Sequence, residues 1–181
     1  MEETISNSIK KIVVLGAEST GKSTLCESLA NHYNTVFVPE FARTYFNVHD
    51  INHYSIQDLE TIAKTQISLE EDYVKKANKL LFCDTSLITI KIWAIHRFNQ
   101  IPEFFKNSIK PTDYHMYLIT NNDIPWLADD QRKNEVSRDS LFKWNQHEMQ
   151  KLGINYHIVK GLGTKRLQHA IDLIDEQGIF F

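Results

Sequence analysis

Short apolar runs alternate along the chain with longer stretches in which apolar residues recur at helical spacing. The runs are almost uninterrupted, which is typical of parallel strands that helices cover on both faces. We expect strands at residues 11–15, 36–38, 80–83, 114–120 and 154–159. We expect helices at residues 23–33, 56–78, 87–98, 102–109, 140–152 and 164–174, and a further short helix opened by Pro39. The alternation predicts an α/β fold with a doubly wound parallel sheet.

Candidate functional residues stand where the predicted strands end. A glycine-rich loop follows the first strand, Glu40 follows the second, Asp84 follows the third, and a polar stretch begins after Thr120 at the end of the fourth. In doubly wound sheets, ligands bind beyond the carboxyl ends of the strands. We therefore expect these groups to meet in one site at that edge.

The glycine-rich loop, residues 16–24, reads Gly-Ala-Glu-Ser-Thr-Gly-Lys-Ser-Thr and fits the pattern G-x-x-x-x-G-K-[ST]. Between a strand and a helix, this pattern predicts a P-loop, whose backbone N–H groups and helix dipole surround a phosphate. Lys22 would reach the β- and γ-phosphates of ATP, Ser23 would ligate the bridging Mg²⁺, and Thr24 would donate to the α-phosphate. The predicted ATP-binding residues are Gly16, Glu18, Ser19, Thr20, Gly21, Lys22, Ser23 and Thr24.

Composition limits the class of protein. The 181 residues are 42% hydrophobic, which suits one compact domain spanning residues 1–181. Twenty basic and 23 acidic residues give a net charge of −3, and without a basic run we expect no nucleic-acid partner. No apolar run approaches the roughly 18 residues of a membrane span. Cys26 and Cys83 fall in expected core elements, which predicts buried thiols and a cytoplasmic protein.

Two carboxylates at the sheet edge are candidates for catalysis. Glu40 and Arg43 are three residues apart, so on a helix they share a face and would hold an acceptor hydroxyl and a phosphate. The alternative is a surface ion pair. Asp84 ends an apolar strand as a Walker B acid does, and with Ser23 it would hold Mg²⁺. The alternatives for Asp84 are contact with the acceptor or a cap on the following helix.

A polar segment after the fourth strand is interpreted as a lid at about residues 122–140. Its two arginines, Arg132 and Arg138, would close over the phosphates and stabilise the charge of the transferring group. A solvated helix face is the alternative for either arginine. Trp126 carries a large apolar ring in this polar context, so it would stack on a base or pack beneath the lid.

Four segments together resemble the NadR-type ribosylnicotinamide kinase domain. They are the P-loop, residues 39–43, residues 77–85 and residues 121–129. The last of these is the most specific, because it reads Asn-x-x-x-Pro-Trp-x-x-Asp ahead of a lid arginine. The resemblance covers nearly the whole chain. It implies a three-layer P-loop kinase fold with a five-stranded parallel sheet in the order 2-3-1-4-5, helices on both faces and a lid.

The resemblance also implies an activity. The domain would transfer the γ-phosphate of Mg²⁺–ATP to the 5′-hydroxyl of nicotinamide riboside, giving nicotinamide mononucleotide for NAD salvage. The implied catalytic residues are Lys22, Glu40, Asp84, Arg132 and Arg138, and the implied acceptor site comprises Glu40, Arg43, Tyr45, Asp84, Trp126 and Asp129. Because the pyridinium ring is cationic, carboxylates and aromatic rings near Glu40, Tyr45 and Asp84 are expected to hold it.

The implied kinase is a stand-alone form, because the chain starts close to the first strand and has no H-x-G-H nucleotidyltransferase motif. Its expected partner is a small-molecule substrate. Two other interpretations stay open at this stage: a kinase for another nucleoside or nucleotide, and a regulatory nucleotide-binding ATPase that lacks an acceptor. The sequence leaves the oligomeric state open.

Overall fold

A parallel sheet forms the centre of the computed structural model, which describes residues 8–125 and 138–179. Within these residues the sheet has five strands in the order β2-β3-β1-β4-β5. The strands are β1 (Lys10–Leu15), β2 (Val36–Val38), β3 (Leu80–Asp84), β4 (Met116–Thr120) and β5 (His157–Val159). All four neighbouring pairs are parallel. The order confirms the predicted 2-3-1-4-5 sheet.

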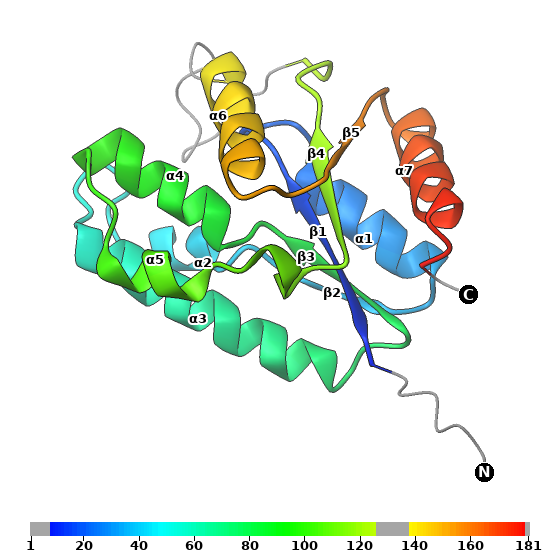
Figure 1. Cartoon of the computed structure of the whole chain (residues 1–181), viewed down its shortest axis with the longest axis horizontal. Helices are drawn as coiled ribbons and strands as arrows, with labels where there is room; N and C mark the ends of the chain where they lie inside the picture. Colours follow the sequence, from blue (N-terminus) through cyan, green and yellow to red (C-terminus); the bar gives the residue numbers. More distant parts are fainter. Residues whose placement is uncertain (1–7, 126–137, 180–181) are drawn as a thin grey trace.

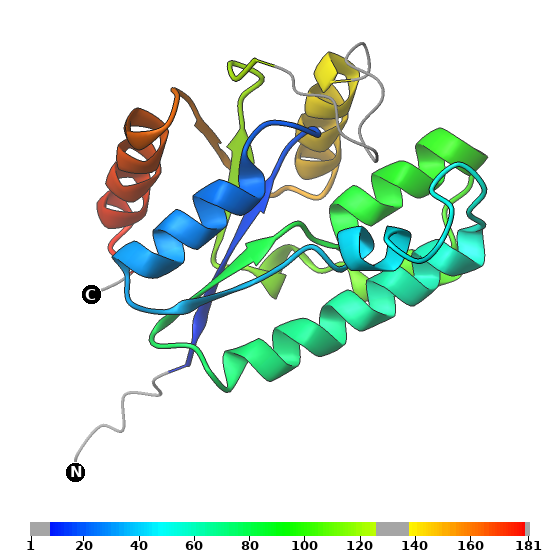
Figure 2. The same cartoon turned by 180° about the vertical axis from the view of Figure 1, so that it is seen from behind.

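Helices cover both faces of this sheet (Figures 1 and 2). They are α1 (Lys22–His32), α2 (Phe41–Phe46), α3 (Ile56–Val74), α4 (Leu87–Phe98), α5 (Glu103–Ser108), α6 (Arg138–Lys151) and α7 (Thr164–Glu176), with a 3₁₀ turn, η1, at Pro111–Asp113. Helices α1 and α7 lie on one side of the sheet, whereas α3, α4 and α6 lie on the other. This is the three-layer arrangement that the alternation of apolar runs predicts.

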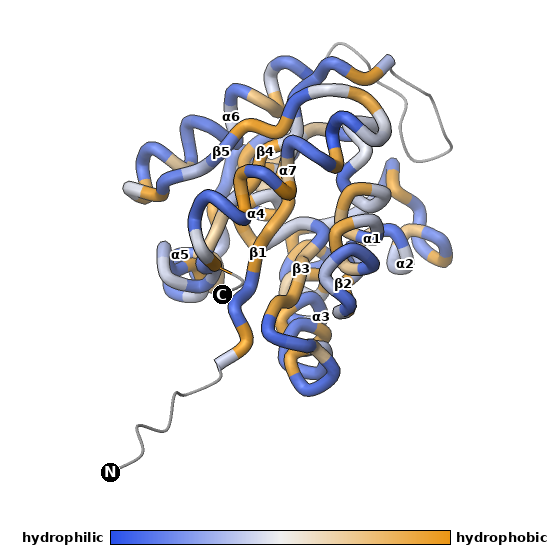
Figure 3. Tube along the Cα trace, turned by 90° about the vertical axis from the view of Figure 1, so that its right-hand side faces the viewer, coloured by the Kyte–Doolittle hydropathy of each residue, from blue (hydrophilic) through white to orange (hydrophobic). Residues whose placement is uncertain are grey.

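The central strand explains why both faces need a cover. Side chains alternate between the faces of a strand, so Ile12 and Val14 pack against α1 and α7. Val13 and Leu15 pack on the opposite side, against α4 and α6. All four are fully buried. In Figure 3 the tube is orange along much of β1, β3 and β4 in the middle of the molecule, whereas blue segments are frequent along the helices around them.

A third apolar cluster lies between α2, α3, α4 and α5. It includes Ala42, Leu59 and Ile90, which join three different helices into one block beside strands β2 and β3. A capping box starts α3, since the Ser55 hydroxyl accepts from the Asp58 N–H and the Asp58 carboxylate accepts from the Ser55 N–H. This block forms one wall of the carboxyl edge of the sheet.

Two of the strands begin later than the sequence predicts. Strands β4 and β5 begin two and three residues later than expected, because the buried apolar residues Tyr114 and Ile154 lie in the loops before them. An apolar run cannot distinguish a strand from a buried loop. Both cysteines are buried free thiols, as expected, and burial raises their pKa values. No helix in the described part of the chain is long and apolar enough to cross a membrane.

Candidate functional site

The P-loop connects β1 to α1, and its conformation requires glycine at both ends. Gly16 has φ +141°, and a Cβ at this position would lie 2.2 Å from the Thr120 hydroxyl on the neighbouring strand β4. Gly21 has φ +75° and forms the N-cap of α1. Both φ values lie in a region that L-residues rarely adopt. The loop is therefore held tightly against the sheet edge.

Hydrogen bonds behind the loop fix its carbonyl groups. The Ala17 carbonyl accepts from the Thr20 hydroxyl at 2.7 Å and from the Lys22 ammonium at 2.9 Å. The Thr20 and Thr120 hydroxyls lie 2.6 Å apart, and Thr20 is fully buried. In a trans peptide the C=O and N–H groups point in opposite directions. A loop carbonyl that is hydrogen-bonded toward the protein therefore leaves the N–H of the same peptide directed away from it, where an anion can bind.

Asp84 ends β3 directly beside the P-loop, as predicted. The Ser23 hydroxyl donates to its Oδ2 at 2.5 Å, while its Oδ1 is buried with no hydrogen-bond partner. A buried carboxylate oxygen without a partner, next to a hydroxyl at the start of a P-loop helix, fits a Mg²⁺ ligand set that nucleotide oxygens complete. Asp84 is not the cap of the next helix, because Ser86 caps α4 by accepting from the Ile88 N–H.

The electrostatics of Asp84 reveal which charges surround it. Its pKa is raised from the usual 3.8 to about 6, mainly by burial and next by the negative charge of Glu40. Lys22, the hydrogen bond from Ser23 and the charge of Arg43 act in the opposite direction. The structure therefore brings together the two carboxylates and two of the cations that the sequence assigned to one site.

Glu40 and Arg43 form the predicted i,i+3 pair at the start of α2, with 3.4 Å between Arg43 Nε and Glu40 Oε2. The Glu40 side chain is only 10% exposed and that of Arg43 is 38% exposed, so the carboxylate is the more buried partner of the pair. Glu40 is also the N-cap residue of α2 and makes no capping hydrogen bond with its side chain. Its carboxylate therefore faces Arg43 and Asp84.

Other predicted site residues lie further from this group. The Tyr45 hydroxyl donates to Asp58 and its ring stacks on His49 with centroids 3.9 Å apart, which places the phenol in the contact between α2 and α3. Thr24 is exposed on the first turn of α1. Glu18 lies near Tyr54, whose pKa is raised mainly by burial and slightly by the Glu18 charge, against the effect of Arg97.

Arg138 differs from its prediction. It is only 6% exposed and begins α6, where its guanidinium donates to the Ile124 carbonyl at 2.9 Å. The alternative interpretation, a solvated helix face, is therefore wrong for Arg138, because this side chain is buried at the first residue of α6. Arg132, Trp126, Asp129 and most of the expected lid lie outside the described residues.

Three residues of the site were missed by the sequence analysis. Thr120 packs against Gly16, and Arg166 and Asp123 form an ion pair beside the loop. Thr120 was recognisable only as the last residue of a strand. Arg166 stands after two glycines near the start of a helix, a pattern that says nothing about its partners.

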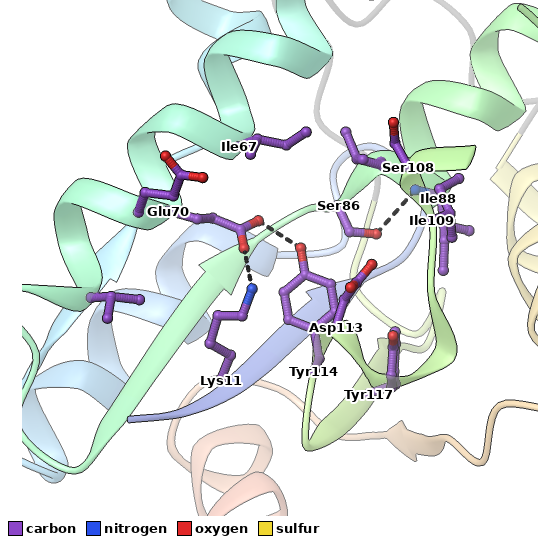
Figure 4. A pocket seen from close by; sticks show the side chains of 13 residues that line it. Lys11, Ile67, Glu70, Ser86, Ile88, Ser108, Ile109, Asp113, Tyr114 and Tyr117 are labelled. Carbon is purple, nitrogen blue, oxygen red and sulfur yellow. Dashed lines mark hydrogen bonds and ion pairs between the residues drawn. The ribbon is translucent and has the colours of Figure 1, made fainter. Parts of the chain in front are cut away.

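In the described part of the chain, no three His, Cys, Asp or Glu side chains gather as a metal site. A separate cavity of about 200 Å³ lies between α3, the start of α4 and residues 108–117. Figure 4 shows Glu70 in this cavity with two partners, since it accepts from Lys11 Nζ at 2.9 Å and from the Tyr114 hydroxyl at 2.6 Å.

Comparisons with known proteins agree with this geometry. Residues 11–166 match the AAA_28 family, described as an AAA domain. The chain is 31% identical over 174 residues to the trifunctional NAD biosynthesis/regulator protein NadR of Salmonella typhimurium, an alignment that covers 93% of this chain and 42% of that protein. The chain thus spans less than half the length of this curated relative.

Two solved structures of NadR are similar to the chain. A NadR protein in complex with NR has a TM-score of 0.81 at 24% identity, and the match covers 93% of this chain and 50% of that chain. A NadR protein in complex with NAD and AMP-PNP has a TM-score of 0.77 at 25% identity, covering 93% of this chain and 49% of that chain. These matches show that the chain shares the fold of the two NadR structures.

Proposed function

The chain belongs to the AAA_28 family and is a NadR-type P-loop kinase domain, and from this premise we propose that it transfers the γ-phosphate of ATP to nicotinamide riboside, giving nicotinamide mononucleotide. The observation that carries the proposal is the pairing of Ser23 with Asp84 beside the P-loop, with a second carboxylate, Glu40, facing them. The NadR complexes with NR and with AMP-PNP support an acceptor and a donor of these kinds. Only this domain's reaction is proposed, because the chain covers 42% of its relative.

On the donor side, the loop N–H groups between Gly16 and Thr24 would bind the phosphates of ATP. The Lys22 ammonium, which donates to the Ala17 carbonyl in this structure, would instead donate to the β- and γ-phosphate oxygens of bound ATP. Ser23 and Asp84 would hold Mg²⁺. When bound, this ion neutralises negative charge on the β- and γ-phosphates and orients them for in-line transfer. Arg132 and Arg138 are the proposed cations for the charge that develops on the transferring group.

On the acceptor side, Glu40 would accept the proton of the 5′-hydroxyl as that oxygen bonds to the γ-phosphorus and the bond to ADP breaks. Arg43 lies 3.4 Å from Glu40 and would hold its carboxylate in place. The positive pyridinium ring would be favoured near Glu40 and Asp84, where two carboxylates face one site. Tyr45, Trp126 and Asp129 complete the proposed acceptor site. The cytoplasm, where both thiols would stay reduced, is the proposed location.

An acceptor screen tests the proposal. Purified protein is incubated with Mg²⁺–ATP and nicotinamide riboside, with each common nucleoside, or with no acceptor, and the release of ADP and the phosphorylated product are measured. We expect ADP release to require nicotinamide riboside and to match the product in amount. Transfer to a different nucleoside would assign another acceptor to the same kinase chemistry. ADP release without any acceptor would refute phosphate transfer and favour a regulatory ATPase.

A further inference from the structure

Arg166 is buried directly behind the P-loop. It is the third residue of α7 and is only 3% exposed, yet its guanidinium donates to groups from three separate segments. It donates to the Thr20 carbonyl at 2.5 Å, the Gly161 carbonyl at 2.7 Å and the Asn121 carbonyl at 3.1 Å, and it pairs with the Asp123 carboxylate. One side chain thus joins the P-loop, the end of β4 and the turn before α7.

The contact with Thr20 determines which way a P-loop peptide faces. The Thr20 carbonyl points at Arg166, so the Gly21 N–H of the same trans peptide points to the opposite side. That side is where the loop N–H groups converge on a phosphate. Gly21 has φ +75° and no side chain to resist rotation, so this peptide depends on an outside group to hold it.

A buried arginine is costly at this position. Burial lowers the pKa of Arg166, and the Asp123 carboxylate only partly offsets that effect. Replacing a buried ion pair by apolar side chains is often neutral or stabilising, so fold stability alone does not require a cation here. The directional donors of a guanidinium, which hold several carbonyls at fixed angles, are what an apolar residue lacks.

We propose that Arg166 is a positioning residue of the phosphate site, which holds the Thr20–Gly21 peptide with its N–H directed at the bound phosphate. Arg166 does not touch the nucleotide in this role. It acts through the backbone of the loop, and Asp123 in turn orients the guanidinium and accepts from the Gly161 N–H at 2.7 Å. The inference rests on the proposed function only in that a nucleotide occupies the P-loop.

The test compares three variants of the full chain by calorimetric titration. Arg166→Met removes every donor, and Arg166→Lys keeps the charge with a single donor group. Ile174→Ala is the matched control, since Ile174 is fully buried on the same helix and far along it from the P-loop. The probes are Mg²⁺–AMP-PNP and inorganic tripolyphosphate, and the melting temperature of each variant is recorded alongside.

We expect Arg166→Met to bind both probes about 10- to 100-fold more weakly, as is typical when a residue that orients a direct ligand is removed. Arg166→Lys should lose less, and Ile174→Ala should bind within about threefold of the parent although it melts at a lower temperature. If Arg166→Met does not fold, Arg166→Lys and the control make the same comparison.

Four results would overturn the inference, the last of them together with the proposed function. Equal weakening by Ile174→Ala would mean that any loosening of α7 has this effect. Unchanged tripolyphosphate binding with weakened AMP-PNP binding would place the role of Arg166 at the turn near Gly161 and not at the phosphates. Unchanged binding of both probes by Arg166→Met would leave no positioning role. A parent chain that binds neither probe would overturn the proposed function together with the inference.

Discussion

Asp84→Asn should stabilise the ligand-free protein, and increasingly so as the pH rises. In the folded state Asp84 has its pKa raised from 3.8 to about 6, first by burial and then by Glu40. A raised pKa means that the folded state prefers the protonated carboxyl, so the ionised form opposes folding. The stability is fully present below pH 3.8 and falls as the pH rises through 6. The neutral amide of the Asp84→Asn variant has no such proton to lose.

The size of the effect follows from the shift. A difference of about two pKa units corresponds to about 3 kcal/mol at pH 8, where Asp84 is ionised in both states. At pH 5 about half of this cost is present, because the folded carboxyl is then mostly protonated while the unfolded one is not. For a domain of this size 1 kcal/mol moves the melting temperature by roughly 2–4 °C. Asp84→Asn should therefore melt about 6–12 °C above the parent at pH 8 and about half as far above it at pH 5.

Thermal melts of parent and variant without nucleotide, at pH 5 and pH 8, measure this difference. Asp72→Asn is the control, because Asp72 is an exposed carboxylate on α3 whose pKa is lowered by Lys75, so its loss should bring no gain at high pH. A gap between Asp84→Asn and the parent that stays constant or shrinks from pH 5 to pH 8 would refute the reasoning. Groups that serve activity often lower the stability of the fold, so a carboxylate that is proposed to bind Mg²⁺ is expected to be replaceable with a gain in stability.

Three further predictions test the roles proposed for the site residues. Glu40→Gln should lose roughly 100-fold in turnover at any magnesium concentration, whereas Asp84→Asn should regain part of its activity at high Mg²⁺; a magnesium titration showing the reverse would exchange the two roles. Lys22→Ala should lose about 10²- to 10³-fold in turnover, and Mg²⁺–ATP should raise its melting temperature less than that of the parent. Gly16→Ala should abolish nucleotide binding in a titration, and Thr120→Ala should not rescue it, because φ +141° remains unfavourable once the 2.2 Å contact is gone.

The sequence predicted the parts of the site that depend on one strand at a time. Glu40, Asp84 and the P-loop each follow an apolar run, and the parallel sheet carries all three to the same edge. The resemblance to a known family supplied the strand order. Residues that depend on which strands are neighbours could not be found in this way, and Thr120 reaches Gly16 only because β4 lies beside β1.

Arg166 illustrates the same limit over a longer distance. Its contact with Thr20 spans 146 positions of sequence and arises because α7 packs beside α1. The helical period locates Arg166 on a helix but does not say that this face meets a loop carbonyl. The burial of Arg138 was missed for a related reason. A polar stretch of sequence predicts exposed side chains, but the Ile124 carbonyl, 14 positions earlier, accepts a hydrogen bond from Arg138 and allows it to be buried.

The paired charges in the cavity of Figure 4 have a consequence for how the chain finds its fold. Glu70 on α3 is neutralised by Lys11, 59 positions away on β1, and hydrogen-bonded by Tyr114, 44 positions away before β4. The sheet places β1 between β3 and β4, and in this order both partners reach α3. A strand order that kept Glu70 buried but separated it from Lys11 would leave a buried charge unpaired, at a cost of several kcal/mol. We expect the contacts of Glu70 with Lys11 and Tyr114 to favour the observed strand order during folding.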